Sequence, residues 1–212
     1  MRPALSVATA APVDPALNMN RKLNRSPEIH IVYPPWVAES FDFERRYVGD
    51  VERMAVAIAA ARENVRRGTG GPFGAAIFEI ESGRLVSVGM NRVVPLHNSV
   101  LHAEIFAIMM AQAVIGSYTL GGDDMAAHEL FTSCEPCGMC LGATPWSGVR
   151  RVVWAATRDD AGRLEFDEGP VFAASYRYLE ARGIRFEQGP LRSEACDVLA
   201  DYRTGGGEIY NG

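Results

Sequence analysis

Three side chains of the kinds that bind transition metals form a pattern typical of a metal site: His102, Cys137 and Cys140. The two cysteines are three residues apart at the start of a predicted helix, so both sulfurs lie on one helical face and can hold a single ion. The positive end of that helix favours thiolates over thiols. Three protein ligands leave a fourth tetrahedral position for water, which indicates a catalytic zinc site rather than a structural one.

Glu104 has the spacing of a general base for that water. It follows His102 by two residues on the same helical turn, near enough to reach the water without binding the ion. Two thiolates neutralise a zinc ion, so the metal acidifies its water less than an all-histidine site does, and a base beside it is needed. The alternative interpretation makes His102 and Glu104 ordinary first-turn residues and the two cysteines a structural thiol pair.

The other two cysteines have weaker signals. Cys134 is a candidate fourth ligand that would close the site, but it precedes Pro136 on the strand side of the turn, where a small buried residue is more usual. Cys196, in a predicted final helix, is expected in the core. Three cysteines within seven residues are too crowded for ordinary disulfides, which favours metal binding in a reducing cytoplasm.

The composition bounds the class of protein. A chain of 212 residues suits one α/β domain with additions, rather than two domains of ~150 residues each. Its net charge of -5 argues against nucleic acid as the main partner. Its longest apolar runs, 54–61 and 105–111, are far shorter than the ~20 residues that cross a bilayer, so we expect no membrane span. The N-terminus lacks the pattern of a secretory signal.

The elements that must position these residues follow from periodicity and from turn residues. Residues 1–40 are predicted to be a loosely ordered or dimer-wrapping arm, in which the motif YPPW is ordered only by docking on something else. Residues 41–204 form the zinc-binding domain, and residues 205–212 form a tail. The pattern predicts helices over 50–66, 102–115, 137–148, 170–183 and 192–203, and strands over 72–80, 84–91, 128–136, 149–157 and 184–189. This order predicts a mixed sheet covered by helices on both faces.

Several longer motifs carry a resemblance to a known family: GGPFGAAIFE, MNRVVP, HAEIFAI, TSCEPCGMCLGA, FDEGP and the closing EIYN. Over about residues 50–212 the chain resembles the guanine deaminase branch of the cytidine and deoxycytidylate deaminase family, in the cytidine-deaminase-like superfamily. The resemblance implies a three-layer α/β fold with a five-stranded mixed sheet between helices, and a homodimer. It also implies a C-terminal tail that can lie over the active site of the partner subunit.

The resemblance assigns roles at matching positions. His102, Cys137 and Cys140 would bind zinc, and Glu104 would shuttle protons. Glu168 matches the family's second acid, placed near the exocyclic amine to help protonate ammonia. Its neighbour Asp167 is the acid with which it is most easily confused, and an ordinary solvated acid is the alternative for either.

Further residues are expected to bind the substrate. By resemblance Phe73 would stack on the base and Asn91 would hydrogen-bond its edge, although a core phenylalanine and a turn asparagine are the ordinary interpretations. Tyr210 is expected to fold over an active site, that of the neighbouring subunit. Ala103 is included as a pocket residue, and Trp146 is either structural or a wall of the pocket.

The expected activity is zinc-dependent hydrolysis of guanine to xanthine and ammonia, with side activity on aminotriazines such as ammeline. Guanosine or another nucleoside is an alternative substrate. A tRNA adenosine deaminase shares the zinc motif, but the acidic balance counts against it. A non-catalytic zinc-binding dimerisation scaffold is the alternative outside enzymes, and it has no need of the Glu104 carboxylate.

Overall fold

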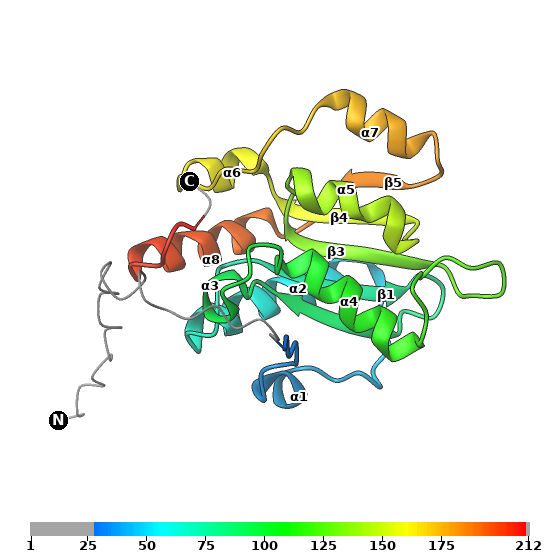
Figure 1. Ribbon diagram of the computed structural model, residues 1–212, viewed down its shortest axis with the longest axis horizontal. Coiled ribbons are helices and arrows are strands. Elements are labelled where there is room, and N and C mark those ends of the chain that lie inside the picture. The colour runs from blue at the N-terminus through cyan, green and yellow to red at the C-terminus, as the bar shows by residue number, and fades with distance from the viewer. Residues whose placement is uncertain (1–27, 211–212) are drawn as a thin grey trace. The chain divides into compact units, whose positions relative to one another are not determined.

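The computed structural model describes residues 28–210. Eight helices and five strands are found in this part of the chain (Figure 1). The helices are α1 (Trp36–Ser40), α2 (Gly49–Arg66), α3 (Val93–Leu96), α4 (Ala103–Ile115), α5 (Gly138–Ser147), α6 (Arg158–Gly162), α7 (Ala173–Glu180) and α8 (Arg192–Thr204). The strands are β1 (Gly74–Glu79), β2 (Leu85–Met90), β3 (His128–Cys134), β4 (Arg151–Ala156) and β5 (Arg185–Gln188).

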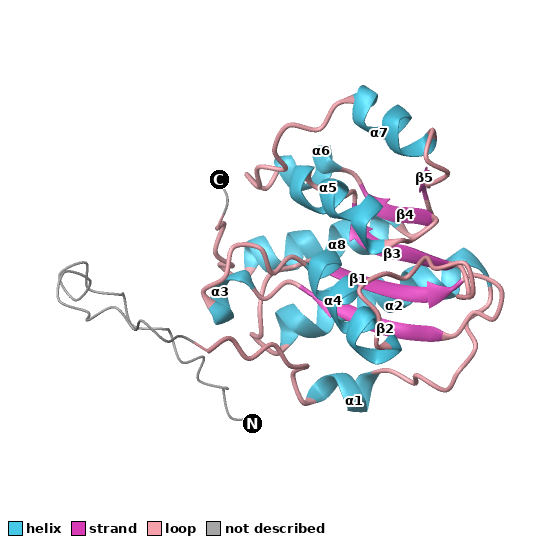
Figure 2. Cartoon of the chain, turned by 45° about the vertical axis from the view of Figure 1, so that its right-hand side comes forward, coloured by secondary structure: helices cyan, strands magenta, loops and turns pink. Residues whose placement is uncertain are grey.

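The strands form one sheet in the order β2-β1-β3-β4-β5. β1 is antiparallel to both β2 and β3, whereas β4 is parallel to β3 and to β5, so the sheet is mixed as predicted. Helices α4 and α5 cover one face, and α2 and α8 cover the other (Figures 1 and 2). Because β1, β2 and most of β3 are covered on both faces, their residues are buried almost without interruption. The three-layer α/β fold is confirmed.

Two glycines on neighbouring strands set the spacing of the layers. A Cβ atom at Gly89 in β2 would overlap the backbone oxygen of Ala103 and lie 2.7 Å from the backbone nitrogen of Ala107, both in α4. A Cβ atom at Gly74 in β1 would overlap the backbone oxygen of Ala57 in α2 on the opposite face. Neither position accepts a side chain, so the first turn of α4 lies directly against the sheet.

The strand directions bring distant residues to one edge of the sheet. β1 runs opposite to β2 and β3, so its beginning lies beside their ends. Phe73 precedes β1, Asn91 follows β2, and Cys134 ends β3. The backbone N–H of Asn91 donates to the Phe73 carbonyl oxygen at 3.0 Å, which fixes two of these positions against each other.

Three short helices, α1, α3 and α6, were not expected from the sequence. In α1, Trp36 is 4% exposed and its indole N–H donates to the Thr69 hydroxyl at 3.2 Å, so the tryptophan of the YPPW motif is ordered by packing on the domain itself. The compact unit therefore begins at Pro34, earlier than the predicted boundary at 41. Residues 28–33 contain neither helix nor strand, and the rest of the predicted arm, residues 1–27, lies outside the described residues.

Two further expectations concern the burial of Cys196 and membrane-spanning helices. Cys196 is not a core residue as expected, because its thiol is only partly buried on α8, close to Asp160. Among residues 28–210, no helix is both long and apolar enough to cross a bilayer.

Candidate active site

The three metal-binding side chains meet at the beginnings of two helices. His102 is the residue before α4, and Cys137 is the residue before α5, whose first turn includes Cys140. Their ligand atoms all lie within 4.8 Å of one another, and His102 Nδ1 is 3.4 Å from Cys137 Sγ. Between residues 28 and 210 this is the one such group of histidine, cysteine and acidic side chains. The donor set and its spacing fit a zinc ion.

The two ligand sulfurs differ in protonation. Hydrogen bonds from the Cys140 thiol and from His102 lower the pKa of Cys137 to about 4, and the thiolate is further held by the Cys140 backbone N–H at 3.5 Å. The hydrogen bond to Cys137, with burial, raises the pKa of Cys140 well above its usual value. A divalent cation that displaces the thiol proton of Cys140 would have two thiolate ligands.

Cys134 lies on the wall of the same cavity but outside the metal-binding group. Its thiol is directed to the carbonyl oxygen of Thr157, 3.5 Å away. Burial and the nearby acids Glu168 and Glu104 raise the pKa of this thiol well above its usual value, so it stays protonated. These observations favour three protein ligands and an open fourth position.

Glu104 is in the first turn of α4 and is 6% exposed. Burial, together with the negative charge of Cys137, raises the pKa of this carboxyl to about 7. A carboxyl with this pKa can both accept and release a proton near neutral pH, as a general acid–base group must.

The structure separates the two neighbouring acids of the FDEGP motif. Glu168 lines the cavity, and burial with the charge of Cys137 raises its pKa to about 8. Asp167 is exposed, and its side-chain oxygen accepts a hydrogen bond from the Gly169 backbone at 2.8 Å. The Glu168 backbone oxygen accepts from the N–H of Gly138, the first residue of α5, at 2.9 Å. Glu168, and not Asp167, is therefore the acid of this motif that lines the cavity.

The cavity between these groups has a volume of about 20 Å³ and is lined by Phe73, His102, Glu104, Cys134, Glu135, Cys137, Glu168 and Tyr210. This is room for about one water molecule and not for a heterocyclic ring. Aromatic rings close it, because Phe166 contacts both Phe73 and Tyr210, at centroid distances of 5.0 and 5.4 Å. A ring-shaped ligand therefore requires side chains around the cavity to move.

Asn91 has a side-chain donor without a partner. The residue is fully buried, its Oδ1 accepts from the Val93 backbone at 3.3 Å, and its Nδ2 has no hydrogen-bond partner. A Cβ atom at Gly71 would lie 3.0 Å from Asn91 Oδ1 and 3.1 Å from the Tyr210 ring, so both side chains lie beside this glycine. Asn91 is not among the residues that line the cavity, but its free amide donor lies near the lining residue Tyr210 and is suited to an acceptor on a ligand.

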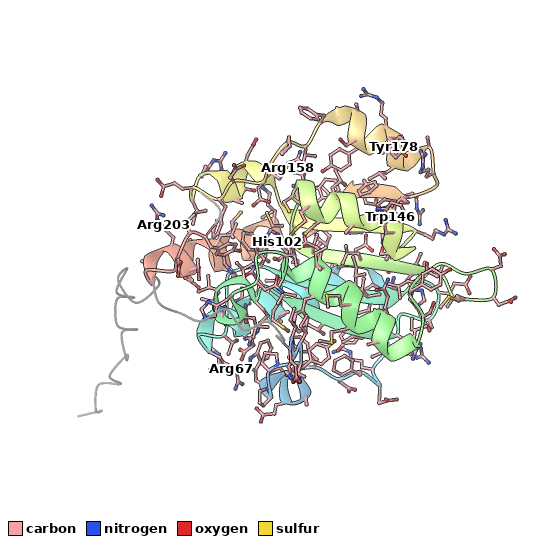
Figure 3. The ribbon with its side chains drawn as sticks, viewed as in Figure 1. Arg67, His102, Trp146, Arg158, Tyr178 and Arg203 are labelled. Carbon is pink, nitrogen blue, oxygen red and sulfur yellow. The ribbon has the colours of Figure 1, made fainter. Side chains whose placement is uncertain are left out.

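The structure also places the other three residues that were expected to bind the substrate. Trp146 does not line the cavity: it is 82% exposed near the end of α5, roughly 13 Å along the helix from Cys137, and it lies well apart from His102 (Figure 3). Tyr210 lines the cavity of its own chain, and its expected place over the active site of a neighbouring subunit stays a prediction. Ala103 is fully buried against β2, behind the cavity lining.

Two residues of the site were missed in the sequence. Phe166 is 3% exposed and joins the loop before Glu168 to Phe73 and Tyr210. Glu135 lines the cavity and is hydrogen-bonded to two other elements. The available signals were an apolar residue inside a charged loop and an acid directly before the Pro-Cys pair.

The geometry agrees with comparisons to known proteins. The model of the cytidine and deoxycytidylate deaminase zinc-binding region matches residues 49–156, just over half of the chain. The chain belongs to the cytidine and deoxycytidylate deaminase family and is a hydrolytic aminohydrolase. Within that family, its relatives place it on the guanine deaminase branch.

The relatives that support this branch are similar along most of their length. Guanine deaminase from Bacillus subtilis (strain 168) is 40% identical over 135 residues, which cover 64% of this chain and 82% of that protein. The solved guanine deaminase from Nitrosomonas europaea is 42% identical, with a TM-score of 0.79 over 86% of this chain and 99% of that chain. A relative with a different activity, the tRNA-specific adenosine deaminase from Agrobacterium fabrum, is less similar, with 32% identity over 157 residues, 74% of this chain and 84% of that protein.

Proposed function

We propose that this protein hydrolyses guanine to xanthine and ammonia, with a zinc ion held by His102, Cys137 and Cys140. The observation that carries the proposal is a pair of acids, the buried Glu104 and the half-buried Glu168, that line one cavity with two residues of this ligand group, His102 and Cys137. One acid suits the proton that must leave the attacking water, and the second suits the proton that the leaving amine must gain. A structure of a protein 42% identical to this chain, solved with 8-azaguanine, supports a purine-like substrate.

The chain's own side chains move the protons of the reaction. When bound, zinc acts as a Lewis acid that makes its water easier to deprotonate. Glu104 accepts the proton of the water that attacks C2 of guanine and passes it to ring atom N3. Glu104 then takes the second proton of the added water as the C2–O bond becomes double, and together with Glu168 it delivers one proton to the amino group, so that the C2–N bond breaks and ammonia leaves.

Three side chains would hold the base. Asn91 would donate its free amide N–H to an acceptor on the ring edge, and Phe73 would stack on the ring. Tyr210 would move outward to admit the base and then cover it, because the present cavity has no room for a purine. Covering the base excludes bulk water from the reaction.

The enclosed cavity favours a free base over a nucleoside or a tRNA. A ribose attached to the base would require a second opening past Tyr210 or Phe166. The net charge of -5 also disfavours a polyanion. Ammeline, an aminotriazine that presents a similar amino-substituted ring, is proposed as a slower substrate.

The test is an ammonia-release screen with guanine, guanosine, ammeline, cytosine and adenosine, together with metal analysis of protein purified without chelators. We expect ammonia and xanthine from guanine, slower release from ammeline, and about one zinc per chain. No product from guanine, or protein free of metal, would refute the proposal. A gel shift with tRNA tests the rival activity and is expected to show no binding.

We further propose that the protein is a homodimer. We also propose that it is located in the cytoplasm, a reducing compartment. Apolar side chains are exposed near the outer ends of α5 and α7, with Trp146 82% and Tyr178 56% exposed, and the two line a groove between these helices (Figure 3). Exposed aromatic residues around an apolar groove are typical of interfaces. Light scattering coupled to gel filtration tests the proposal, and a monomeric mass would contradict it.

A further inference from the structure

Glu135 has no part in the chemistry above, yet it lies on the wall of the cavity. It occupies the turn between β3 and α5, and its side chain is 13% exposed. One carboxylate oxygen accepts a hydrogen bond from the Tyr176 hydroxyl at 2.8 Å and forms an ion pair with the Arg158 guanidinium, 3.0 Å away. The other accepts from the Arg158 backbone N–H at 3.2 Å. Such charge-assisted bonds are stronger than neutral ones, so this carboxylate is a firm point of attachment.

Its two partners flank the segment that carries Glu168. Arg158 is the first residue of α6, and Tyr176 lies in α7. Residues 163–172, here called the acid loop, connect these two helices (Figure 1). Glu135 is thus bonded to the helix before the acid loop and to the helix after it.

The same short turn also holds the acid loop at its middle. The Gly138 backbone N–H donates to the Glu168 backbone oxygen at 2.9 Å. Residues 135–138 therefore contact both flanking helices and the centre of the loop, and they include the metal ligand Cys137. The position of Glu168 relative to this ligand is set within four consecutive residues.

Arg158 gives the arrangement a second consequence. Arg158 and Glu168 line the same hollow on the surface of α6, and the positive charge of Arg158 reaches Glu168. The guanidinium is bonded to Glu135 and to the Tyr176 hydroxyl, the latter at 3.1 Å. If the Glu135 charge were removed, Glu168 would be the acid available to Arg158.

We propose that Glu135 is a positioning residue that, through Arg158 and Tyr176, holds the acid loop so that Glu168 faces the cavity and stays unpaired. The inference rests on the proton-delivering role proposed for Glu168. It assigns Glu135 no contact with the substrate. Its effect is on geometry, and small displacements of a reacting group are costly in rate.

The first test is Glu135→Gln in the zinc-loaded protein. We expect kcat for guanine to fall about ten-fold or more with KM within about two-fold, because Glu168 acts in the chemical step. We also expect unchanged zinc content and faster amide hydrogen exchange across residues 163–172. Tyr176→Phe should give the same pattern more weakly, since it removes one hydroxyl and leaves the ring packed on Trp154 and Phe186. The Tyr176→Phe variant provides the test if the Glu135→Gln variant does not fold.

A double variant separates positioning from a general structural role. If Glu135 acts through Glu168, then Glu135→Gln causes no further loss of kcat when Glu168→Gln is already present. Losses that multiply would overturn the inference. So would a kcat that falls together with zinc content, because Glu135 would then support the metal ligands instead.

The matched control is Glu165→Gln, the same chemical change on the same loop. Glu165 is exposed and pairs with Arg203 on α8, so kcat and hydrogen exchange should match the wild type. If the wild-type protein releases no ammonia from guanine, the proposed function has failed. If it is active and the Glu135→Gln variant is unchanged in both kcat and exchange, only the positioning role has failed.

Discussion

Acidic side chains lie near both ends of β3, but their negative charges are compensated in different ways. At its beginning, Glu129 is fully buried and forms ion pairs with Arg53 of α2 and Arg151 of β4. Beyond its other end, Glu104 and Glu168 face a cavity, and from residue 28 to residue 210 no arginine or lysine forms an ion pair with either of them. Their neighbours are an imidazole and sulfurs.

The difference shows that the role of a buried carboxyl can be inferred from the groups that surround it. An acid bonded to two guanidinium groups is complete within the chain, and it joins the elements that supply them. An acid beside a thiolate is a repulsive pair, which must bind a proton or a cation to remain buried. The first end therefore contributes to the fold, and the second is prepared for a metal and for proton transfer. The following variants test this division, from the largest expected effect to the smallest.

Glu104→Gln is expected to have the largest effect on activity. Removing the group that takes the proton from water should lower kcat for guanine by about 10³-fold, within the range for general acid–base groups. Zinc content and the thermal melting temperature should be retained, because the amide has the same shape and adds no charge. Steady-state kinetics with metal analysis test this, and unaltered turnover with zinc retained would support a non-catalytic scaffold.

Glu129→Gln is expected to have the opposite profile. It leaves two arginines near a buried site without their shared acid, so the free energy of unfolding should fall by about 3 kcal/mol. The kcat of the remaining folded protein should be near that of the wild type. Urea unfolding measures the change, and Glu187→Gln, which alters the half-exposed partner of Arg151, is the control. A loss of kcat without a loss of stability would contradict the division.

Removal of the metal should act on the second end alone. Zinc at a hundred-fold excess over its Kd stabilises the folded state by about 2.7 kcal/mol, so a chelator should lower the melting temperature and abolish turnover. Returning zinc should restore both, whereas magnesium, which prefers oxygen ligands, should restore neither. A melting temperature that does not respond to the chelator would argue against the proposed ligand group.

Asp50→Asn is expected to have the smallest effect. Asp50 pairs with Arg151 at 2.6 Å but is 39% exposed, so we expect a loss of less than about 1 kcal/mol at pH 7. The hydrogen bond from Arg151 lowers the pKa of Asp50 below its usual value. Its stabilisation is thus present above pH 3.8 and is lost as the pH falls through the lower folded-state pKa. Urea unfolding of both proteins should show a difference at pH 7 that disappears in strong acid.

The long elements could be predicted from the sequence because their patterns are strong. The helix predicted over 50–66 is α2, Gly49–Arg66, and the final helix predicted over 192–203 is α8, Arg192–Thr204. The short helices could not be predicted, because tertiary contacts and single caps stabilise them. Trp36 in α1 is held by Thr69, and α6 begins with a reciprocal capping box between Thr157 and Asp160.

The residues of the candidate site also divide into those that local sequence spacing predicts and those that depend on the tertiary structure. His102, Glu104 and the cysteine pair are recognisable because their spacing within helical turns is local. Glu168 is distant in sequence, and only the family resemblance distinguished it from Asp167. The exposure of Trp146 depends on how α5 lies on the domain, and the bonds of Glu135 depend on where α6 and α7 begin. Sequence spacing contains neither of these facts.

The absence of a side chain at Gly89 has a consequence for engineering. Because β2 touches the backbone of α4 there, the height of His102 and Glu104 above the sheet is fixed by a missing methyl group. Grafting the zinc ligands and Glu104 onto another scaffold would reproduce the side chains but not their distance from the sheet. A transplanted site needs a glycine at this position of the strand beneath the helix as much as it needs the ligands.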